Sequence, residues 1–304
     1  MKKPLKNVGT SVRAKLLQLA KQRGDDFQLV LLRYVNERLL YRLATSSHAN
    51  RFVLKGAALF TVWTGQPHRA TRDLDLLGFG DSSEANLRGV FNEVVTVKAE
   101  DDGVVFDASS LEVGPIRENQ EYGGVRVTLT AHVAEAKVRV QVDVGFGDAI
   151  TPEALEIDFP ALLSFPAPRL RAYPKETVIA EKLDAMVQLG LANSRMKDFY
   201  DLRLLSELFD FDGQLLVNAI QATFTRRGTP VPDELPVALS PEFLGDPGKA
   251  RQWSAFASKS GASDVGDFAS IMARVARFVT EPLKQARTTV PWKATWPKGG
   301  PWSS

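Results

Sequence analysis

Two runs of alternating residues constrain the fold of this chain most strongly, VRVTLTAHV at 125–133 and KVRVQVDVGF at 137–146. Alternate residues of a β-strand point to opposite faces of a sheet, so each run predicts a strand with one apolar and one polar face. Gly123 and Gly124 mark a turn nearby. The runs therefore predict antiparallel neighbours in a sheet that is covered on one side.

The rest of the first half alternates between helix and strand patterns. Residues 51–56 predict a short strand closed by glycine, 57–63 a small-residue helix, and 72–80 a strand with one polar face. Helices are expected at 11–23, 27–43 and 83–96, with Asp25 as the cap of the second. Arg33, Arg38 and Arg42 should lie largely off the apolar face of that second helix.

The second half reads as mainly helical. A proline-rich passage at 152–168 precedes helical patterns at 175–193, 195–209, 249–259 and 265–288. A stretch with five prolines, 228–248, is expected to form an exposed connection. We therefore predict an α+β protein, with a mixed-sheet domain at 1–165 and a mainly helical domain at 166–304.

Composition removes several classes of function. The 304 residues include no cysteine, which excludes disulfides, thiolate zinc sites, iron–sulfur clusters and cysteine nucleophiles. The three histidines are too far apart for a zinc-binding HExxH helix, and no P-loop, GxGxxG or GxSxG motif occurs. With 44% hydrophobic residues, the chain has the composition of a globular protein.

The net charge of +2 hides an asymmetry along the chain. Residues 1–60 carry a net charge of +9, and residues 73–160 carry −12. A basic arm beside an acidic body suggests a polyanion or nucleotide partner, although the solvated faces of ordinary basic helices explain it equally well. No stretch reaches the roughly 18 apolar residues of a membrane span, and the N-terminus lacks a signal-peptide core. A cytoplasmic protein without a membrane partner is expected.

Asp73 and Asp75 form the sharpest local feature. In a strand, residues two apart share a face, so the two carboxylates can converge on one or two divalent cations. Hard cations such as Mg²⁺ take oxygen ligands and often share them with substrate phosphates. Asp143 lies between two valines of the second alternating run and is the candidate third acid. The alternative is that the pair merely decorates a solvent-facing strand, and the pattern alone leaves this open.

A second group of polar residues falls on the predicted helices at 175–209. Lys182 lies on the first helix, and Asp198 and Asp201 are three residues apart on one face of the second. An amphipathic hairpin with surface ion pairs is the simpler interpretation. The five tryptophans, three of them in the C-terminal tail, favour core packing or a partner contact over base stacking.

Three separated motifs together resemble one known family. The runs FVLKGAALFTVWTGQPHRATRDLDL, QVDVGF and AEKLDA…NSRMKDFYDL resemble the AbiEii/MenT nucleotidyltransferase toxins, in order and spacing, over roughly residues 50–205. The resemblance implies a DNA polymerase β-like nucleotidyltransferase fold. It also implies an antitoxin encoded beside the toxin, in a bacterial toxin–antitoxin or phage-defence system.

The resemblance implies roles for individual residues. Asp73 and Asp75 match the carboxylates that bind the metal, Mg²⁺ or alternatively Mn²⁺, and the nucleoside triphosphate (NTP), while Asp143 matches the third acid. Lys182 matches the lysine that binds the phosphates, and Asp201 the later aspartate suggested as a base. The further nucleotide-binding residues that the resemblance implies are Lys55, Gly56, Arg69, Thr71, Arg195, Lys197 and Asp198.

The first motif departs from the family pattern. The family commonly has serine or threonine after the glycine, whereas Ala57 and Ala58 follow Gly56 here. Backbone amides at a helix N-terminus still bind phosphate, so the departure bears on nucleotide affinity and preference more than on activity.

The expected reaction is transfer of a nucleoside monophosphate from an NTP to RNA, at the 3′ end of tRNA, which would block translation. The expected partners are the NTP, tRNA and an AbiEi-like antitoxin. Two alternatives stay open: transfer to a protein hydroxyl, and a non-catalytic module that binds nucleic acid or a partner, which the missing hydroxyl after Gly56 suggests.

Overall fold

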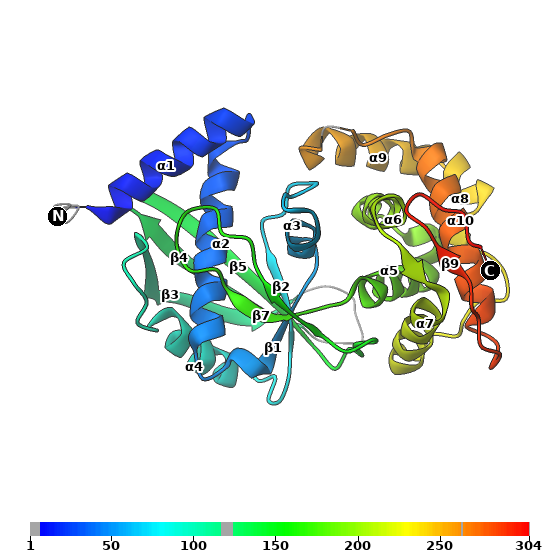
Figure 1. Cartoon of the computed structure of the whole chain (residues 1–304), viewed down its shortest axis with the longest axis horizontal. Helices are drawn as coiled ribbons and strands as arrows, with labels where there is room; N and C mark the ends of the chain where they lie inside the picture. The colour runs from blue at the N-terminus through cyan, green and yellow to red at the C-terminus, as the bar shows by residue number, and fades with distance from the viewer. Residues whose placement is uncertain (1–6, 117–123, 263, 304) are drawn as a thin grey trace. The chain divides into compact units, whose positions relative to one another are not determined.

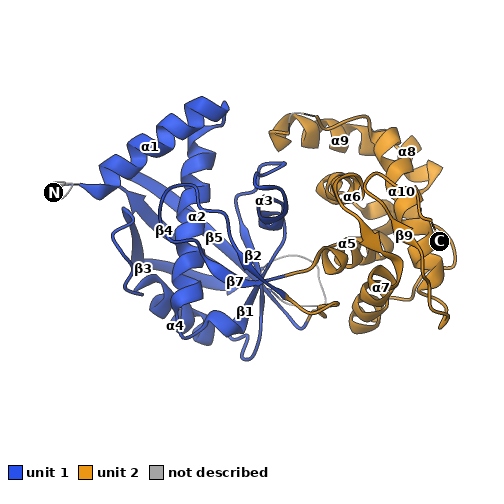
Figure 2. Ribbon diagram, viewed as in Figure 1, with its two compact units in different colours: residues 1–147, 155–172 blue, residues 148–154, 173–304 orange. Residues whose placement is uncertain are grey.

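The chain divides into two compact units (Figure 2). The structure, a computed structural model, describes residues 7–116, 124–262 and 264–303. Unit 1 comprises residues 1–147 and 155–172, and unit 2 comprises 148–154 and 173–304. Unit 1 contains a sheet with helices and unit 2 is mainly helical, which confirms the α+β class expected from the sequence. None of the helices in the described ranges is both long enough and apolar enough to cross a bilayer.

A seven-stranded mixed sheet forms the centre of unit 1 (Figure 1). Its strand order is β3-β4-β5-β2-β1-β7-β6. The pairs β2–β5 and β1–β7 are parallel, and all other neighbours are antiparallel. The strands are β1 (Phe52–Lys55), β2 (Leu74–Gly78), β3 (Val104–Pro115), β4 (Val125–Val133), β5 (Ala136–Phe146), β6 (Leu155–Asp158) and β7 (Arg169–Ala172).

The helices of unit 1 are α1 (Val8–Arg23), α2 (Phe27–Thr45), α3 (Ala58–Thr64) and α4 (Glu84–Val95), with a short 3-10 helix at Ala49–Arg51. Helices α2 and α4 contact each other and pack on the sheet (Figure 1). The apolar residues of β4 and β5 are buried in register, as in the pairs Val127–Val142 and Leu129–Val140. The alternation in the sequence therefore predicted this antiparallel pair and its covered face correctly. The turn expected at Gly123–Gly124 lies partly outside the described residues.

Short polar side chains set the ends of the first two helices. Asn7 caps α1 by accepting from the amide of Thr10, and Gly24 ends it in the left-handed conformation (φ 70°). The cap of α2 is Asp26, which accepts from Leu29, and not the expected Asp25. Asp25 instead accepts a hydrogen bond from Arg33 at 3.1 Å.

Helix α2 buries charges that the sequence pattern placed off its apolar face. Arg38 is 0% exposed, beside Glu37 and the carbonyl of Pro166, and Arg42 makes a two-bond ion pair with buried Asp102 at 2.8 and 3.1 Å. Arg38 and Arg42 are buried because the segment after β6 and the turn before β3 cover this side of the helix. These arginines therefore serve the core and do not contribute to a basic surface.

Glu37 should make stability fall as pH rises. Burial raises its pKa to about 7 against the opposing effect of Arg38, so the folded chain holds a proton that the unfolded chain releases near pH 4.5. The free energy of unfolding should then decrease between about pH 4.5 and 7, by up to about 1.4 kcal/mol per pH unit. Urea titrations of wild type and Glu37→Gln across this range measure the effect. If the free energy of unfolding had the same pH dependence in both proteins, the effect could not be assigned to Glu37.

Unit 2 packs its helices around α5 and α10. Helix α7 contacts α5, while α10 contacts α6 and α7. The helices are α5 (Lys175–Leu189), α6 (Met196–Leu208), α7 (Gly213–Arg227), α8 (Pro241–Gly245), α9 (Pro247–Ser260) and α10 (Phe268–Gln285), with 3-10 turns at Gly190–Ala192 and Val237–Leu239 and a two-stranded ribbon, β8 (Phe211–Asp212) with β9 (Thr295–Trp296). Segment 148–154 joins this unit through Thr151, which exchanges hydrogen bonds with the Thr177 hydroxyl at 3.0 and 2.8 Å.

The tryptophans of the C-terminal tail pack into unit 2, as predicted. Trp296 is 2% exposed and donates to the carbonyl of Ser206, while Trp302 donates to the carbonyl of Phe278, each at 2.8 Å. The ring of Phe278 packs against both, with ring centroids at 4.9 and 5.9 Å, and the two indoles contact each other at 5.4 Å. Aromatic packing and indole hydrogen bonds thus hold the tail against α10.

Several elements have no counterpart in the sequence prediction. The proline-rich passage contributes β6 and β7, and α7 fills the interval after α6. The stretch at 228–248 is more ordered than the exposed connection expected from its prolines. It contains a 3-10 turn and α8, and it buries Ala238, Leu239 and Phe243.

Candidate functional site

The turn between β1 and α3 brings the backbone against a carboxylate of β2. Gly56 adopts a left-handed conformation (φ 75°), which favours glycine. A Cβ atom at this position would lie 2.0 Å from Oδ2 of Asp75, closer than any real contact. Two independent reasons therefore favour glycine at position 56: its left-handed backbone conformation, and the Asp75 side chain, which leaves no room for a Cβ atom.

A row of four charged residues crosses the middle of the sheet. On β1, β2, β5 and β4 in turn, Lys55 pairs with Asp75, Asp75 with Asp143, and Asp143 with Arg126. Residues opposite each other on neighbouring strands share a face. All four side chains therefore lie on one face of the sheet, opposite the buried valines of β5, and all are partly exposed. On β1 and β2 the same face also carries the buried residues Val53 and Leu77. Asp73 directly precedes β2 and is also partly exposed.

The two ends of this row are cations and its centre is acidic. Asp143 is held by Arg126 through two hydrogen bonds, from Nε and Nη2 to its two oxygens, each of 2.8 Å. Gln141 adds a donor at 3.3 Å. This bidentate geometry is the strong form of an arginine–carboxylate pair. The structure thus places the three predicted acids in one region of unit 1, with a partner at Asp143 that the sequence did not suggest.

The donor chemistry fits a divalent cation at two of the three acids. Asp73 and Asp75 supply carboxylate oxygens, the ligands that Mg²⁺ prefers, next to a turn whose backbone lies against Asp75. Both oxygens of Asp143 accept from Arg126. Across the described residues, no three His, Cys, Asp or Glu side chains are arranged so that they could hold a metal ion. A site with all three acids as ligands would therefore require Asp143 to exchange Arg126 for the metal.

The loop before β2 holds two further predicted residues. Thr71 donates to the backbone carbonyl of Asp73 at 3.4 Å, and Arg69 donates to the carbonyl of Ala70 at 3.5 Å. Both residues are partly exposed. Ala57, at the start of α3, forms no side-chain cap, in keeping with the missing hydroxyl in this motif.

In unit 2, α5 and α6 bring the second predicted group together. Lys182 Nζ lies 2.6 Å from Asp198 Oδ1 and 2.9 Å from Asp201 Oδ2. Arg195 Nε lies 2.6 Å from the other oxygen of Asp198. The two aspartates are 0% and 1% exposed, so this is a buried network and not the surface ion pairs of the simpler interpretation. Lys197 is on the exposed side of α6.

Charge compensation keeps Asp198 ionised inside unit 2. Burial alone would raise the pKa of its carboxyl, but Lys182 and Arg195 together hold that pKa well below its usual range. Lys182 in turn has a carboxylate on each of two sides. Its ammonium group is consequently fixed in position, with 13% of the side chain exposed.

Two cations near this group, the partly buried Arg227 and the buried Lys249, were missed from the sequence. Arg227, at the end of α7, contacts Asp148 at 2.9 Å, Asp184 at 3.0 Å and Glu181 at 3.3 Å, which ties segment 148–154 to α5. Lys249 is 4% exposed and donates to the carbonyl of Asn193 at 2.9 Å, next to the start of α6. The one available signal was the pair of acids one turn apart on α5, Glu181 and Asp184, but their partner Arg227 is on a helix that was not predicted.

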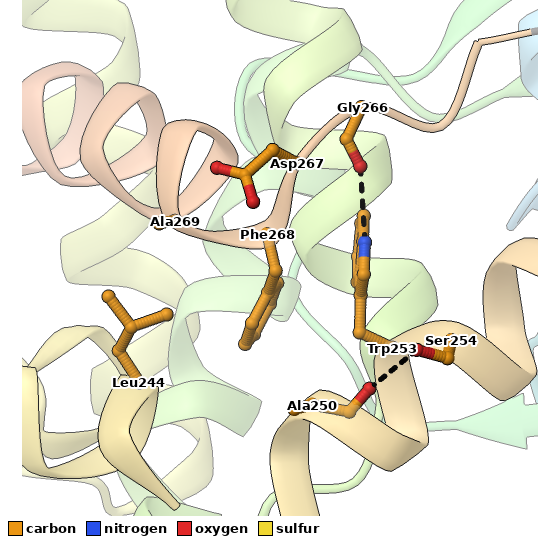
Figure 3. A pocket seen from close by; sticks show the side chains of 8 residues that line it. All are labelled: Leu244, Ala250, Trp253, Ser254, Gly266, Asp267, Phe268 and Ala269. Atoms are coloured by element: carbon orange, nitrogen blue, oxygen red, sulfur yellow. Dashed lines mark hydrogen bonds between the residues drawn. The ribbon is translucent and has the colours of Figure 1, made fainter. Parts of the chain in front are cut away.

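A cavity of about 330 Å³ lies elsewhere in unit 2, among α8, α9 and α10 (Figure 3). Trp253 stacks on Phe268 at 4.8 Å and donates to the carbonyl of Gly266. The acid that lines it, Asp267, caps α10 by accepting from Ser270. The indole of Trp253 and the carboxylate of Asp267, which line the cavity, are thus hydrogen-bonded to neighbouring residues. None of the predicted site residues lines the cavity.

Comparisons with known proteins identify the family. A family model described as "Nucleotidyl transferase AbiEii toxin, Type IV TA system" matches residues 38–274, more than half of the chain. A comparison with curated protein sequences finds no match. Two solved structures are similar, JHP933 from Helicobacter pylori and a candidate nucleotidyltransferase from H. pylori. Each is 14% identical, with a TM-score of 0.51 over 86% of this chain, and the matches cover 94% and 97% of those chains.

At that identity the solved structures support the fold, while the family match covers both groups of predicted residues. Its range includes Asp75, Asp143, Lys182 and Asp201. The acidic row of unit 1 and the lysine network of unit 2 both lie within it. The chain therefore belongs to the AbiEii family, the nucleotidyltransferase toxins of type IV toxin–antitoxin systems.

Proposed function

We propose that this protein transfers a nucleoside monophosphate from an NTP to RNA, at the 3′ end of tRNA, and thereby blocks translation. The row of Lys55, Asp75 and Asp143 beside the Gly56 turn is the observation that carries the proposal. It combines hard oxygen ligands with backbone and lysine groups suited to phosphate. The family implies an NTP substrate and an antitoxin partner, which we propose to be AbiEi-like, in a phage-defence setting.

The candidate site residues of unit 1 have separate proposed roles. Asp73 and Asp75 would hold Mg²⁺, or Mn²⁺ in its place, and the bound cation would neutralise charge on the triphosphate and on the attacking oxygen. Lys55 and the amides after Gly56 bind phosphate oxygens, which fixes the nucleotide against the sheet. Arg69 and Thr71 contribute to the same nucleotide site from the loop before β2.

Unit 2 holds a positioned cation. Asp198 and Asp201 hold the ammonium of Lys182, which we propose binds the triphosphate. Arg195, which contacts Asp198, and the exposed Lys197 are proposed to bind the nucleotide as well. A cation that is already oriented loses little side-chain freedom when it binds a phosphate. Asp201 is proposed to assist deprotonation of the acceptor hydroxyl or to position it, and its hydrogen bond to Lys182 links that task to nucleotide binding.

Helix α1 favours RNA as the acceptor. Its exposed residues include Arg13, Lys15, Lys21 and Arg23, and the helix contains no acidic residue. Such a surface binds a phosphate backbone with little sequence preference, and the binding weakens with salt. An activity on tRNA belongs in the cytoplasm, the location expected from the sequence.

Asp75→Asn should abolish nucleotide transfer, because it removes a negative ligand from the proposed metal site. Incubation of the protein with tRNA, Mg²⁺ and each labelled NTP in turn measures label in RNA, with an expected loss of at least about 100-fold. Glu100→Gln, an exposed acid after α4, removes the same charge away from the row and should retain activity.

The other outcomes decide between the alternatives. Label in protein after RNase treatment of a cell lysate would replace the RNA acceptor by a protein hydroxyl. Label in neither, from folded protein that binds the nucleotide, would contradict nucleotide transfer altogether. Cellular toxicity that persists unchanged in Asp75→Asn would point to the non-catalytic binding module.

A further inference from the structure

The two carboxylates at the centre of the charged row, Asp75 and Asp143, repel each other unless positive charge compensates them. Asp75 and Asp143 are directly opposite each other on neighbouring parallel strands, whose spacing is about 4.8 Å. Like charges that face each other across a strand pair are destabilising. Two carboxylates in this position therefore require positive charge nearby, from side chains or from a bound cation.

Arg126 supplies part of that charge in a form that competes with a metal. Its two hydrogen bonds of 2.8 Å occupy both oxygens of Asp143, the same atoms a cation would use. The guanidinium is 40% exposed and Asp143 is 17% exposed, so the pair can open toward solvent without disturbing the buried face of the sheet. Side chains on the other face, Val142 and Val144, are fully buried and hold the strand in place.

We infer that Arg126 is a positioning residue that binds Asp143 in the metal-free protein and releases it when a divalent cation binds beside Asp73 and Asp75. The inference rests on the proposed function, because it takes the cation site from it. In the metal-free state Arg126 neutralises Asp143 and lowers the repulsion from Asp75. When the cation takes over this compensation, Arg126 becomes available to solvent or to an anion. The Arg126–Asp143 pair thereby raises the dissociation constant for the cation, because the pair must open before Asp143 can bind it.

The experiment measures binding of Mn²⁺ alone, by electron paramagnetic resonance, to the full-length protein without nucleotide. Arg126→Gln removes the competitor and should lower the Mn²⁺ dissociation constant about fivefold, the scale of a partly exposed ion pair. Asp143→Asn should weaken binding. In the double variant, Arg126→Gln should give no gain, because the oxygens that it sets free are absent.

Arg139→Gln is the matched control. Arg139 is an exposed arginine of β5, on the same face as Asp143 and four residues before it. Its removal changes the net charge of that face equally but leaves the Arg126–Asp143 pair intact. A fivefold gain in this variant as well would overturn the inference, because the effect would then reflect general electrostatics.

The outcomes separate the inference from the proposed function. If Asp75→Asn binds Mn²⁺ as well as wild type does, the proposed metal site is wrong and the inference falls with it. If Asp75→Asn loses binding while Arg126→Gln binds like wild type, the metal site stands and only the role of Arg126 is wrong. A purely structural pair would lower the melting temperature of Arg126→Gln without changing Mn²⁺ affinity.

Discussion

Substitution of Gly56 by alanine is expected to abolish nucleotide transfer while leaving the protein folded. The new Cβ would meet three atoms of the Asp75 side chain, Oδ2, Cγ and Cβ, at 2.0, 2.7 and 2.8 Å. The Asp75 carboxylate must therefore leave its position, or the turn after β1 must shift. Displacement of a reacting group by about 1 Å costs on the order of 100-fold in rate, and we expect at least this loss in the labelled-NTP assay.

Gly65→Ala is the control for the backbone effect. Gly65 ends α3 with nearly the same left-handed conformation (φ 78°), but nothing lies within 4 Å of its Cβ position. Alanine there should lower the free energy of unfolding by about 1 kcal/mol and leave transfer intact. If Gly65→Ala lost activity as severely as Gly56→Ala, the stability of α3 would explain both results, and the contact with Asp75 would not.

Asp198→Asn should cost about 3–5 kcal/mol of folding free energy, the range found when one partner of a buried ion pair is removed. Asparagine keeps the size of the side chain but leaves Lys182 with one carboxylate and Arg195 with none from this network. Urea unfolding at pH 7 measures the loss. A cost below about 1 kcal/mol would contradict the assignment of this network to the stability of unit 2.

The same variant changes how stability responds to acid. Since the folded pKa of Asp198 is depressed, its contribution is present above the unfolded value of 3.8 and is lost as pH falls through the lower folded value. Asp198→Asn should therefore remove part of the acid sensitivity of unfolding. Glu156→Gln is the matched control, because it breaks an ion pair with Arg169 in which the two side chains are 68% and 72% exposed. It should cost less than about 1 kcal/mol.

Local periodicity was sufficient for the elements that carry the acidic row. Alternation predicted β4 and β5, and the glycine after 51–55 predicted the end of β1. The Asp-x-Asp pair predicted a polar strand face, and Asp75 is partly exposed, but Leu77 on the same face is buried. These features depend on neighbouring residues in the sequence, which is why pattern alone identified them.

Features that depend on strand register or on packing could not be predicted in this way. Arg126 and Asp143 are 17 residues apart, and only the pairing of β4 with β5 places them opposite each other. Arg38 and Arg42 resembled surface residues because nothing in the helix pattern indicates that the segment after β6 covers Arg38 and that the turn before β3 covers Arg42. Helix α7 supplies Arg227, whose hydrogen-bond partners Asp184 and Asp148 are 43 and 79 residues away.

The short segment 148–154 belongs to unit 2 although β6 and β7 of unit 1 follow it in the chain. Its anchors, the Asp148–Arg227 ion pair and the Thr151–Thr177 hydrogen bonds, form with residues that come after Ala172. The polypeptide therefore passes between the units three times, and no single cut separates them. A fragment that ends at residue 147 would therefore lack β6 and β7 of the sheet, and a fragment that begins at residue 173 would lack Asp148, the ion-pair partner of Arg227.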